Sequence, residues 1–223
     1  MPQLRVLNFH GIGTPERDLE PGEAPYWITL ERFRALLDLV GARPDRDRIR
    51  MTFDDGNSSD VALAAPLLQQ RGLKASFFVL AGRIGSIGSL GLEDIAALLR
   101  AGMGLGSHGM HHVDWRRLDA TGLETELSGS RRRLEDICGH PVVAAAIPFG
   151  AYNARVLKSL AAAGYREAYS SDGGPMSEGA FLRPRKTVRA DTSLAEIGDF
   201  LSGREPLAHR LRRRLATEMK RWR

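Results

Sequence analysis

The sequence lacks the marks of several kinds of protein. Its 223 residues include one cysteine, Cys138, so no internal disulfide can form, which suits a reducing compartment. No apolar run is long enough to span a membrane. The start of the chain has no basic segment, apolar stretch and cleavage site of a signal peptide. We therefore expect a cytoplasmic protein with one globular domain.

The net positive charge of the chain is confined to its C-terminal end. The chain has a net charge of +5, but residues 204–223 contain eight Lys or Arg and two Glu, so this tail carries +6 and residues 1–203 carry −1. A nearly neutral body argues against nucleic-acid binding. We expect two parts: a domain over 1–203 and a basic tail over 204–223.

The tail has the pattern of a basic amphipathic helix. Its apolar residues recur at nearly helical spacing between arginines: Leu207, Leu211, Leu215, Met219 and Trp222. Two interpretations stay open. The helix packs on the domain, or it makes a peripheral contact with an anionic membrane surface, which would place the protein at the inner face of the membrane.

The domain alternates between strand-like and helix-like patterns about seven times. Strands are predicted over 5–9, 49–53, 75–80, 103–106, 142–147, 167–171 and 182–188, with helices between them. Short alternating units of this kind predict right-handed parallel crossovers. The expected fold class is therefore α/β, as a parallel sheet or barrel, followed by a C-terminal basic helix.

Polar and glycine-rich segments follow these strands consistently. His10 follows the first strand, Asp54 and Asp55 the second, His108 and His112 the fourth, Pro148 and Phe149 the fifth, and Asp172 the sixth. The carboxyl ends of barrel strands share one face, where active sites form. Five such strand ends predict an active site there.

Two adjacent acids, Asp54 and Asp55, are the centre of this prediction. Neighbouring residues of a regular strand point to opposite faces, so the strand must end here, and Gly56 allows the turn. Asp55, His108 and His112 would supply one carboxylate and two imidazoles to a divalent metal, and His111 is a rival to His112. Asp54 would then be free to act as general base on metal-activated water.

These segments resemble, in order, the first three motifs of the polysaccharide deacetylases, the NodB-homology carbohydrate esterases of family four. The matching segments are Thr52 to Gly56, His108 to His112 and Pro148 to Gly150, and the likeness covers roughly residues 4 to 200. The resemblance implies a distorted (β/α) barrel with about seven strands and one divalent metal, usually zinc. It also implies that Asp54 is the base and that Asp55, His108 and His112, rather than His111, hold the metal.

Three positions depart from the family pattern. Gly109 replaces a Ser or Thr, and Ala146 stands where an arginine would orient the base, so Arg183 or Arg185 is expected to replace it. The late histidine that serves as general acid is missing. Because the first and last strands of a barrel are neighbours, we expect His10 to take that role, against the alternative that it only bonds its loop.

The resemblance implies hydrolysis of N-acetyl groups on an amino-sugar polysaccharide. Because no leader is seen, we also expect a lipid-linked saccharide intermediate, as in exopolysaccharide biosynthesis, to be a substrate candidate. Substrate contacts are expected from Phe149, Gly150, Asp172 and Arg185. Two alternatives within enzymes are an O-acetyl esterase and an amidohydrolase acting on a non-sugar amide. The alternative of another class is a catalytically inactive barrel that binds carbohydrate.

Overall fold

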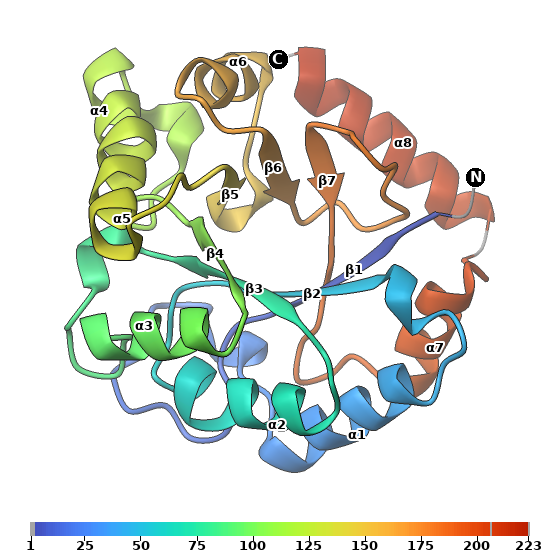
Figure 1. Ribbon diagram of the computed structural model, residues 1–223. Helices are drawn as coiled ribbons and strands as arrows, with labels where there is room; N and C mark the ends of the chain where they lie inside the picture. The colour runs from blue at the N-terminus through green and yellow to red at the C-terminus, as the bar shows by residue number, and fades with distance from the viewer. Residues whose placement is uncertain (1–2, 206, 223) are drawn as a thin grey trace.

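Eight parallel strands form one sheet in the computed structural model, which describes residues 3–205 and 207–222 and omits the side chains of residues 207–210, 214, 221 and 222. The strand order is β7-β6-β5-β4-β3-β2-β1-β8 (Figure 1). The strands are β1 (Arg5–Phe9), β2 (Ile49–Phe53), β3 (Ala75–Val79), β4 (Gly104–Ser107), β5 (Ala144–Ala146), β6 (Glu167–Ser170), β7 (Leu182–Pro184) and β8 (Lys186–Thr187).

The sheet is a nearly closed barrel because consecutive strands lie at its two edges. β7 pairs with β6, and β8, one residue later, pairs with β1. The α/β barrel prediction is confirmed, and the strand count is eight rather than about seven. The difference comes from the predicted strand over 182–188, which divides at Arg185 where the chain crosses from one edge to the other.

Helices connect the strands on the outside of the barrel (Figure 1). The α-helices are α1 (Leu30–Gly41), α2 (Ala65–Gln70), α3 (Leu92–Arg100), α4 (Ala120–Glu124), α5 (Ser130–Cys138), α6 (Ala154–Ala162), α7 (Leu194–Ser202) and α8 (Leu207–Trp222). π-helical turns precede α2, as η3 (Asp60–Ala64), and join α4 to α5, as η6 (Thr125–Gly129). Short 3₁₀ turns are η1 (Ala24–Tyr26), η2 (Arg46–Arg48), η4 (Ala81–Arg83), η5 (Trp115–Arg117) and η7 (Pro148–Gly150).

Capping side chains explain where individual helices start. Thr29 accepts a hydrogen bond from the backbone N–H of Arg32 at 3.2 Å and begins α1, and Ser193 accepts from Glu196 at 3.1 Å and begins α7. In α1 the residues at helical spacing are buried: Phe33, Leu36, Leu37 and Val40.

Aromatic side chains fill the space between the sheet and α1. The rings of Phe9 and Phe53 stack at 5.1 Å, those of Phe53 and Phe77 stack at 4.7 Å, and Phe33 packs edge-on against Phe9. This packing fixes β1, β2 and β3 side by side, and with them the strand ends that carry His10 and the two aspartates.

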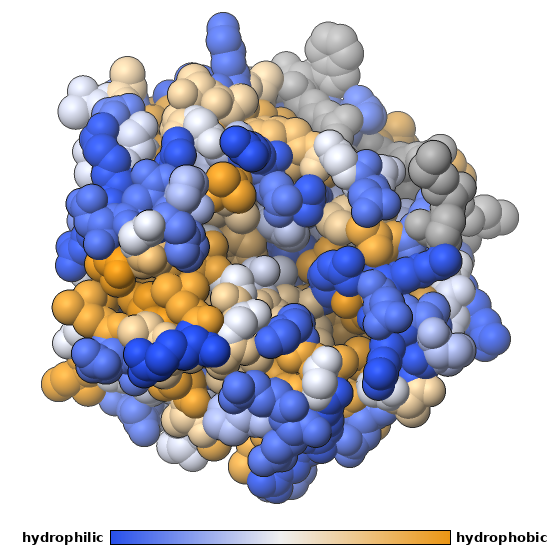
Figure 2. All heavy atoms as spheres, viewed as in Figure 1, coloured by the Kyte–Doolittle hydropathy of each residue, from blue (hydrophilic) through white to orange (hydrophobic). Residues whose placement is uncertain are grey.

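The outer surface mixes hydrophilic and apolar side chains in the view of Figure 2. Within residues 3–205 and 207–222, no helix combines the length and apolar character needed to cross a bilayer.

Candidate metal and catalytic site

Four of the five strand ends that the sequence singled out meet in one cleft of about 340 Å³. Its walls include residues that follow β1, β2, β4 and β5, together with the loop between β1 and α1. The lining residues are His10, Glu20, Pro21, Gly22, Glu23, Tyr26, Asp54, Asp55, His108, His112, Ile147, Phe149, Ser171, Thr187 and Arg189. The convergence expected on one face of the barrel is therefore observed for the residues after β1, β2, β4 and β5, but not for Asp172 after β6.

The backbone at Asp55 explains how two adjacent acids reach the same cleft. Asp55 has a φ of 77°, in the left-handed region that residues other than glycine rarely adopt, and Gly56 follows with a φ of 69°. The strand alternation therefore ends after Asp54. Both carboxylates are 2% exposed, so each needs a compensating partner within the protein or the cleft.

Asp55, His108 and His112 form a group that suits a metal ion. Asp55 Oδ1 lies 3.5 Å from Nε2 of His108 and 3.7 Å from Nε2 of His112, and the three candidate ligand atoms lie within 4.8 Å of one another. Asp55 Oδ1 is buried and has no hydrogen-bond partner. An orphaned carboxylate oxygen facing two imidazoles fits a divalent cation of the zinc type.

The other ring nitrogen of each histidine is occupied. Nδ1 of His108 lies 2.9 Å from the carbonyl oxygen of Ala146, and Nδ1 of His112 lies 3.0 Å from Oε2 of Glu20. Because a carbonyl or carboxylate oxygen accepts, each Nδ1 donates, which leaves Nε2 unprotonated in a neutral ring. This pattern is typical of metal-ligating histidines.

Burial governs the protonation of this group. It lowers the pKa of His108 to about 3 and that of His112 to about 4, so both imidazoles are neutral near pH 7. Burial, and then the charge of Asp54, raises the pKa of Asp55 to about 8. A cation beside Asp55 would reverse that shift, since it favours the carboxylate form.

Glu126 decides between His111 and His112. Its buried carboxylate lies 2.9 Å from Nδ1 of His111 and accepts from the backbone N–H groups of His111 and Met110. The side chain of His111 is 61% exposed and is not in the three-residue group. His112, with a φ of 55°, turns toward Asp55 instead.

Arg185 holds Asp54. Its guanidinium donates to Oδ1 of Asp54 at 2.7 Å and to Oδ2 at 2.8 Å, and Asn8 Nδ2 also donates to Oδ2 at 2.9 Å. Burial by itself raises the pKa of Asp54, but the charge and hydrogen bonds of Arg185, together with the nearby His108 and His10, outweigh it and hold that pKa well below its usual range. The other candidate, Arg183, pairs with Glu167 at 2.8 Å.

His10 lies next to Asp54, with Nε2 4.0 Å from Oδ2 of the carboxylate. Its Nδ1 is buried without a hydrogen-bond partner, and its ring packs against Tyr26 at 4.9 Å. β1 pairs with β8, so a histidine after the first strand does occupy the junction with the last strand. Burial lowers the pKa of His10 to about 4.

The predicted substrate contacts divide into two pairs. Phe149 is 61% exposed on the cleft, with its ring 4.5 Å from that of His112, and Gly150 follows it in the same turn. Arg185 is 0% exposed, so it contacts Asp54 and not a ligand in the cleft. Asp172 is not among the cleft residues; its carboxylate instead accepts from Tyr152, Ser170 and Lys220. Neither residue faces this cleft, and the substrate contacts predicted for them stay predictions.

Gly109, one of the departures from the family pattern, has a local reason. Its φ is 89°, and a Cβ at this position would lie 2.6 Å from Oε2 of Glu126. A serine or threonine would therefore collide with the carboxylate that arranges the turn.

Glu20 is the site residue that sequence reasoning missed. It lies in the loop between β1 and α1, bonds His112 and forms an ion pair with Arg83. The signal available in the sequence was an acid-rich loop directly after a strand that ends in His10.

Comparison with known proteins identifies relatives over most of the chain. The family model described as "Polysaccharide deacetylase" matches residues 41–168. The chain is 24% identical over 212 residues to YxkH of Bacillus subtilis (strain 168), a provisionally named polysaccharide deacetylase; the match covers 89% of this chain and 76% of that protein.

A chitin deacetylase from Pestalotiopsis sp. is 30% identical over 115 residues, 52% of this chain and 38% of that protein. Among solved structures, the Streptococcus pyogenes deacetylase PplD in complex with acetate superposes with a TM-score of 0.75 at 21% identity, covering 92% of this chain and 99% of that chain. That likeness shows the same fold.

Proposed function

The chain belongs to the polysaccharide deacetylase family, and from this premise we propose that it is a metal-dependent hydrolase that removes N-acetyl groups from an amino-sugar glycan. One observation carries the proposal. The carboxylate of Asp54 lines the same cleft as the group formed by Asp55, His108 and His112. One acid belongs to that group and the other does not, which is the division that hydrolysis by an activated water needs.

Asp55, His108 and His112 would hold the metal, and we propose zinc because a carboxylate with two imidazoles is a frequent zinc ligand set. When bound, such an ion polarises a carbonyl oxygen and lowers the pKa of water toward neutrality. Glu20 and the carbonyl of Ala146 would keep the two imidazoles in the tautomer and orientation suited to binding.

Asp54 would act as the general base. Arg185 keeps it ionised and fixes both of its oxygens, so it can accept a proton from the water whose oxygen attacks the acetyl carbon. As the carbon–nitrogen bond breaks, the amine nitrogen needs a proton. His10 has a lowered pKa and is neutral beforehand, so we propose that it takes the proton from Asp54, 4.0 Å away, and passes it to the nitrogen.

Phe149 would bind the sugar. Its ring is exposed on the cleft and lies against His112, where it offers a flat apolar surface to a pyranose ring. Gly150 follows it with a φ of 59°, and a Cβ there would meet Ser171 at 2.9 Å, so this turn accepts only glycine without rearrangement.

Release of acetate from N-acetylglucosamine oligomers tests the proposal. Asp54→Asn should lower the turnover rate by a factor of about 10²–10⁴, because the amide cannot accept the proton. His111→Gln is the matched control: it changes an exposed histidine of the same loop that Glu126 holds outside the metal group, and it should stay within a few-fold of wild type. Equal rates for wild type and Asp54→Asn would remove the assigned base.

Metal content separates the enzyme from a protein of another class. Purified protein should hold one divalent ion per chain and should stop releasing acetate when a chelator removes it. Metal-free protein that still binds glycan would instead support a catalytically inactive binding barrel. Release of acetate only from O-acetylated substrates would favour the esterase with the same site.

The natural substrate is proposed to be an acetylated amino-sugar polysaccharide or a lipid-linked saccharide of exopolysaccharide biosynthesis. The chitin deacetylase among the relatives supports an acetylated amino-sugar polymer. We also propose a location in the cytoplasm at the inner face of the membrane, with a peripheral contact through the basic tail.

A further inference from the structure

The C-terminal helix α8 presents an apolar stripe to solvent. Leu211, Leu215 and Met219 follow one another at intervals of four residues, so they lie on one face, and they are 60%, 67% and 58% exposed. Single exposed apolar residues are ordinary on protein surfaces, but a row of three on one helix marks a contact surface. Leu207 and Trp222 continue the pattern in the sequence, but their side chains lie outside the described residues.

The other side of α8 contacts the barrel. Lys220 donates to Asp172 at 2.6 Å and to the carbonyl of Gly150 at 3.2 Å, and its ammonium lies 5.2 Å from the ring centre of Tyr152. Nearer the start of the helix, Arg213 pairs with Glu205 of the same tail and lies against the barrel at Gly174, where an added Cβ would be 2.6 Å from its Nε. A surface helix usually buries its apolar face. In α8 this apolar face is exposed instead, while Arg213 and Lys220 on the other side are half-buried.

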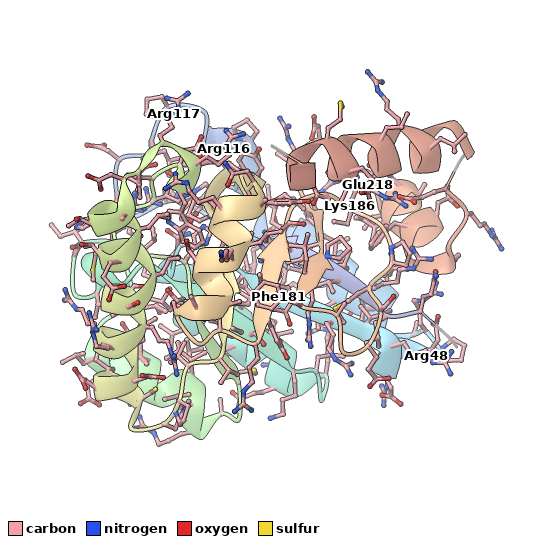
Figure 3. The ribbon with its side chains drawn as sticks, turned by 90° about the horizontal axis from the view of Figure 1, so that it is seen from above. Arg48, Arg116, Arg117, Phe181, Lys186 and Glu218 are labelled. Carbon is pink, nitrogen blue, oxygen red and sulfur yellow. The ribbon has the colours of Figure 1, made fainter. Side chains whose placement is uncertain are left out.

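This arrangement combines the two interpretations that the sequence left open. Charged side chains anchor the helix to the barrel, and its apolar side chains remain available to a partner. Seen from above, α8 runs along the outer side of the molecule, where Glu218 marks its position (Figure 3).

Charge identifies the kind of partner. Residues 204–223 carry +6 and the remaining residues −1, so the stripe sits in the part of the chain that attracts anions. A second copy fits poorly, because a two-fold interface pairs the same surface with itself and would bring two such tails together. An anionic lipid surface suits both the positive charge of the tail and its apolar stripe, since it attracts basic residues and accepts apolar side chains at its headgroup boundary.

We propose that α8 docks the protein onto an anionic lipid bilayer, with Leu211, Leu215 and Met219 inserted at the headgroup boundary. The helix lies along the surface and does not cross it, in keeping with its 16 residues and its many charges.

The docked helix would also place the cleft close to the lipid. Lys220 reaches the carbonyl of Gly150, the residue after Phe149 at the cleft. Resting on the proposed function, this connection favours a glycan attached to the membrane as the substrate. The docking itself does not depend on catalysis.

Vesicle co-sedimentation of the full chain tests the docking. The vesicles are pure phosphatidylcholine or an equimolar mixture of phosphatidylcholine and phosphatidylserine. Wild type should bind the mixed vesicles at least about tenfold more tightly, and raising the salt from about 0.1 M to about 1 M should weaken that binding as the Debye length falls to about 3 Å. L211Q/L215Q/M219Q should lose at least about tenfold in affinity because the inserted apolar area is gone.

I87Q/L92Q is the matched control, since Ile87 and Leu92 are 84% and 60% exposed but lie outside α8. It should bind as wild type does, and unchanged melting curves show that both variants fold. Equal binding to the two vesicle types, or an unaffected triple variant, overturns the proposal. So does a wild-type dimer that the triple substitution dissociates, because the stripe would then face a second copy. Acetate release from short soluble oligomers is measured separately, so failure of docking and failure of the proposed function are distinguishable.

Discussion

Replacing Arg185 with methionine should remove the group that keeps Asp54 ionised and in place. The guanidinium is fully buried and donates to both oxygens of Asp54, to Asn8 at 2.8 Å and to Thr52 at 3.2 Å. Methionine is an unbranched side chain that fills irregular space, so the main loss is charge and hydrogen bonds rather than volume. In the Arg185→Met variant, the hydrogen bond that Asn8 donates to Asp54 would remain among those of the described residues.

The expected loss of stability is large for a single residue. Removing one partner of a buried ion pair lowers the free energy of unfolding by about 3–5 kcal/mol, since the remaining charge is left without compensation. Arg185→Lys keeps a positive charge but cannot donate two parallel bonds, so we expect a smaller loss, of about 1–3 kcal/mol.

The pH dependence has a definite sign. In wild type the pKa of Asp54 is lowered from its ordinary value of 3.8, so its contribution to stability is present above 3.8 and disappears as the pH falls below it. Without Arg185, burial raises that pKa, and folding then favours protonation of Asp54. The difference in stability between wild type and Arg185→Met should therefore be largest near neutral pH and should narrow as the pH falls toward 3.8.

Urea unfolding in the presence of a chelator measures these differences without a contribution from bound metal. Wild type, Arg185→Met, Asp54→Asn and the double variant form a thermodynamic cycle, and we expect a coupling energy of about 2–3 kcal/mol near pH 7. A loss below about 1 kcal/mol in Arg185→Met, combined with additive effects in the double variant, would show that Asp54 does not depend on this arginine.

Three further predictions concern the histidines of the cleft. Glu20→Gln should weaken metal binding by a factor of about 10–100 in competition with a chelating dye, and Glu16→Gln, in the same loop but bonded to a serine, should not. His10→Ala should lower turnover by a factor of about 10²–10⁴ while leaving metal content unchanged, and turnover within a few-fold of wild type would remove its role. His112→Gln should lose the metal, whereas His111→Gln should retain it, as elemental analysis would show; the reverse result would exchange the two histidines.

The strand ends could be predicted from the sequence because they depend on local pattern and on one topological rule. Apolar runs ending in Asp54, His108 and Phe149 mark strands, and parallel strands bring their carboxyl ends together. The division of the last strand at Arg185 could not be predicted. It depends on which edge each half pairs with; Pro184 marks an edge strand or a strand end, but it does not show that the chain continues at the opposite edge of the sheet.

Contacts between side chains far apart in the sequence could not be predicted either. The choice between His111 and His112 is made by Glu126, on the π-helical turn η6, and by Glu20, in the first loop. Asp172 follows a strand as Asp54 and Asp55 do, yet it forms an ion pair with Lys220 of the last helix. Residue type and strand position predict which side chains are available, while long-range ion pairs decide which of them face the cleft.

Backbone conformation at the cleft could not be predicted from the sequence either. Three residues other than glycine have positive φ among those described, namely Asp55, His112 and Phe149, and all three line the cleft. Left-handed conformations cost such residues about 1–2 kcal/mol, so the surrounding fold must stabilise them.

Phe149→Gly and Phe149→Ala both remove the exposed ring, but only glycine relieves the conformation at φ 59°. The glycine variant should therefore unfold with a free energy about 1 kcal/mol higher than the alanine variant, and both should raise KM for the oligomer to a similar extent. An alanine variant as stable as the glycine variant would show that the turn carries no strain, and a normal KM in both would show that the ring does not bind the sugar.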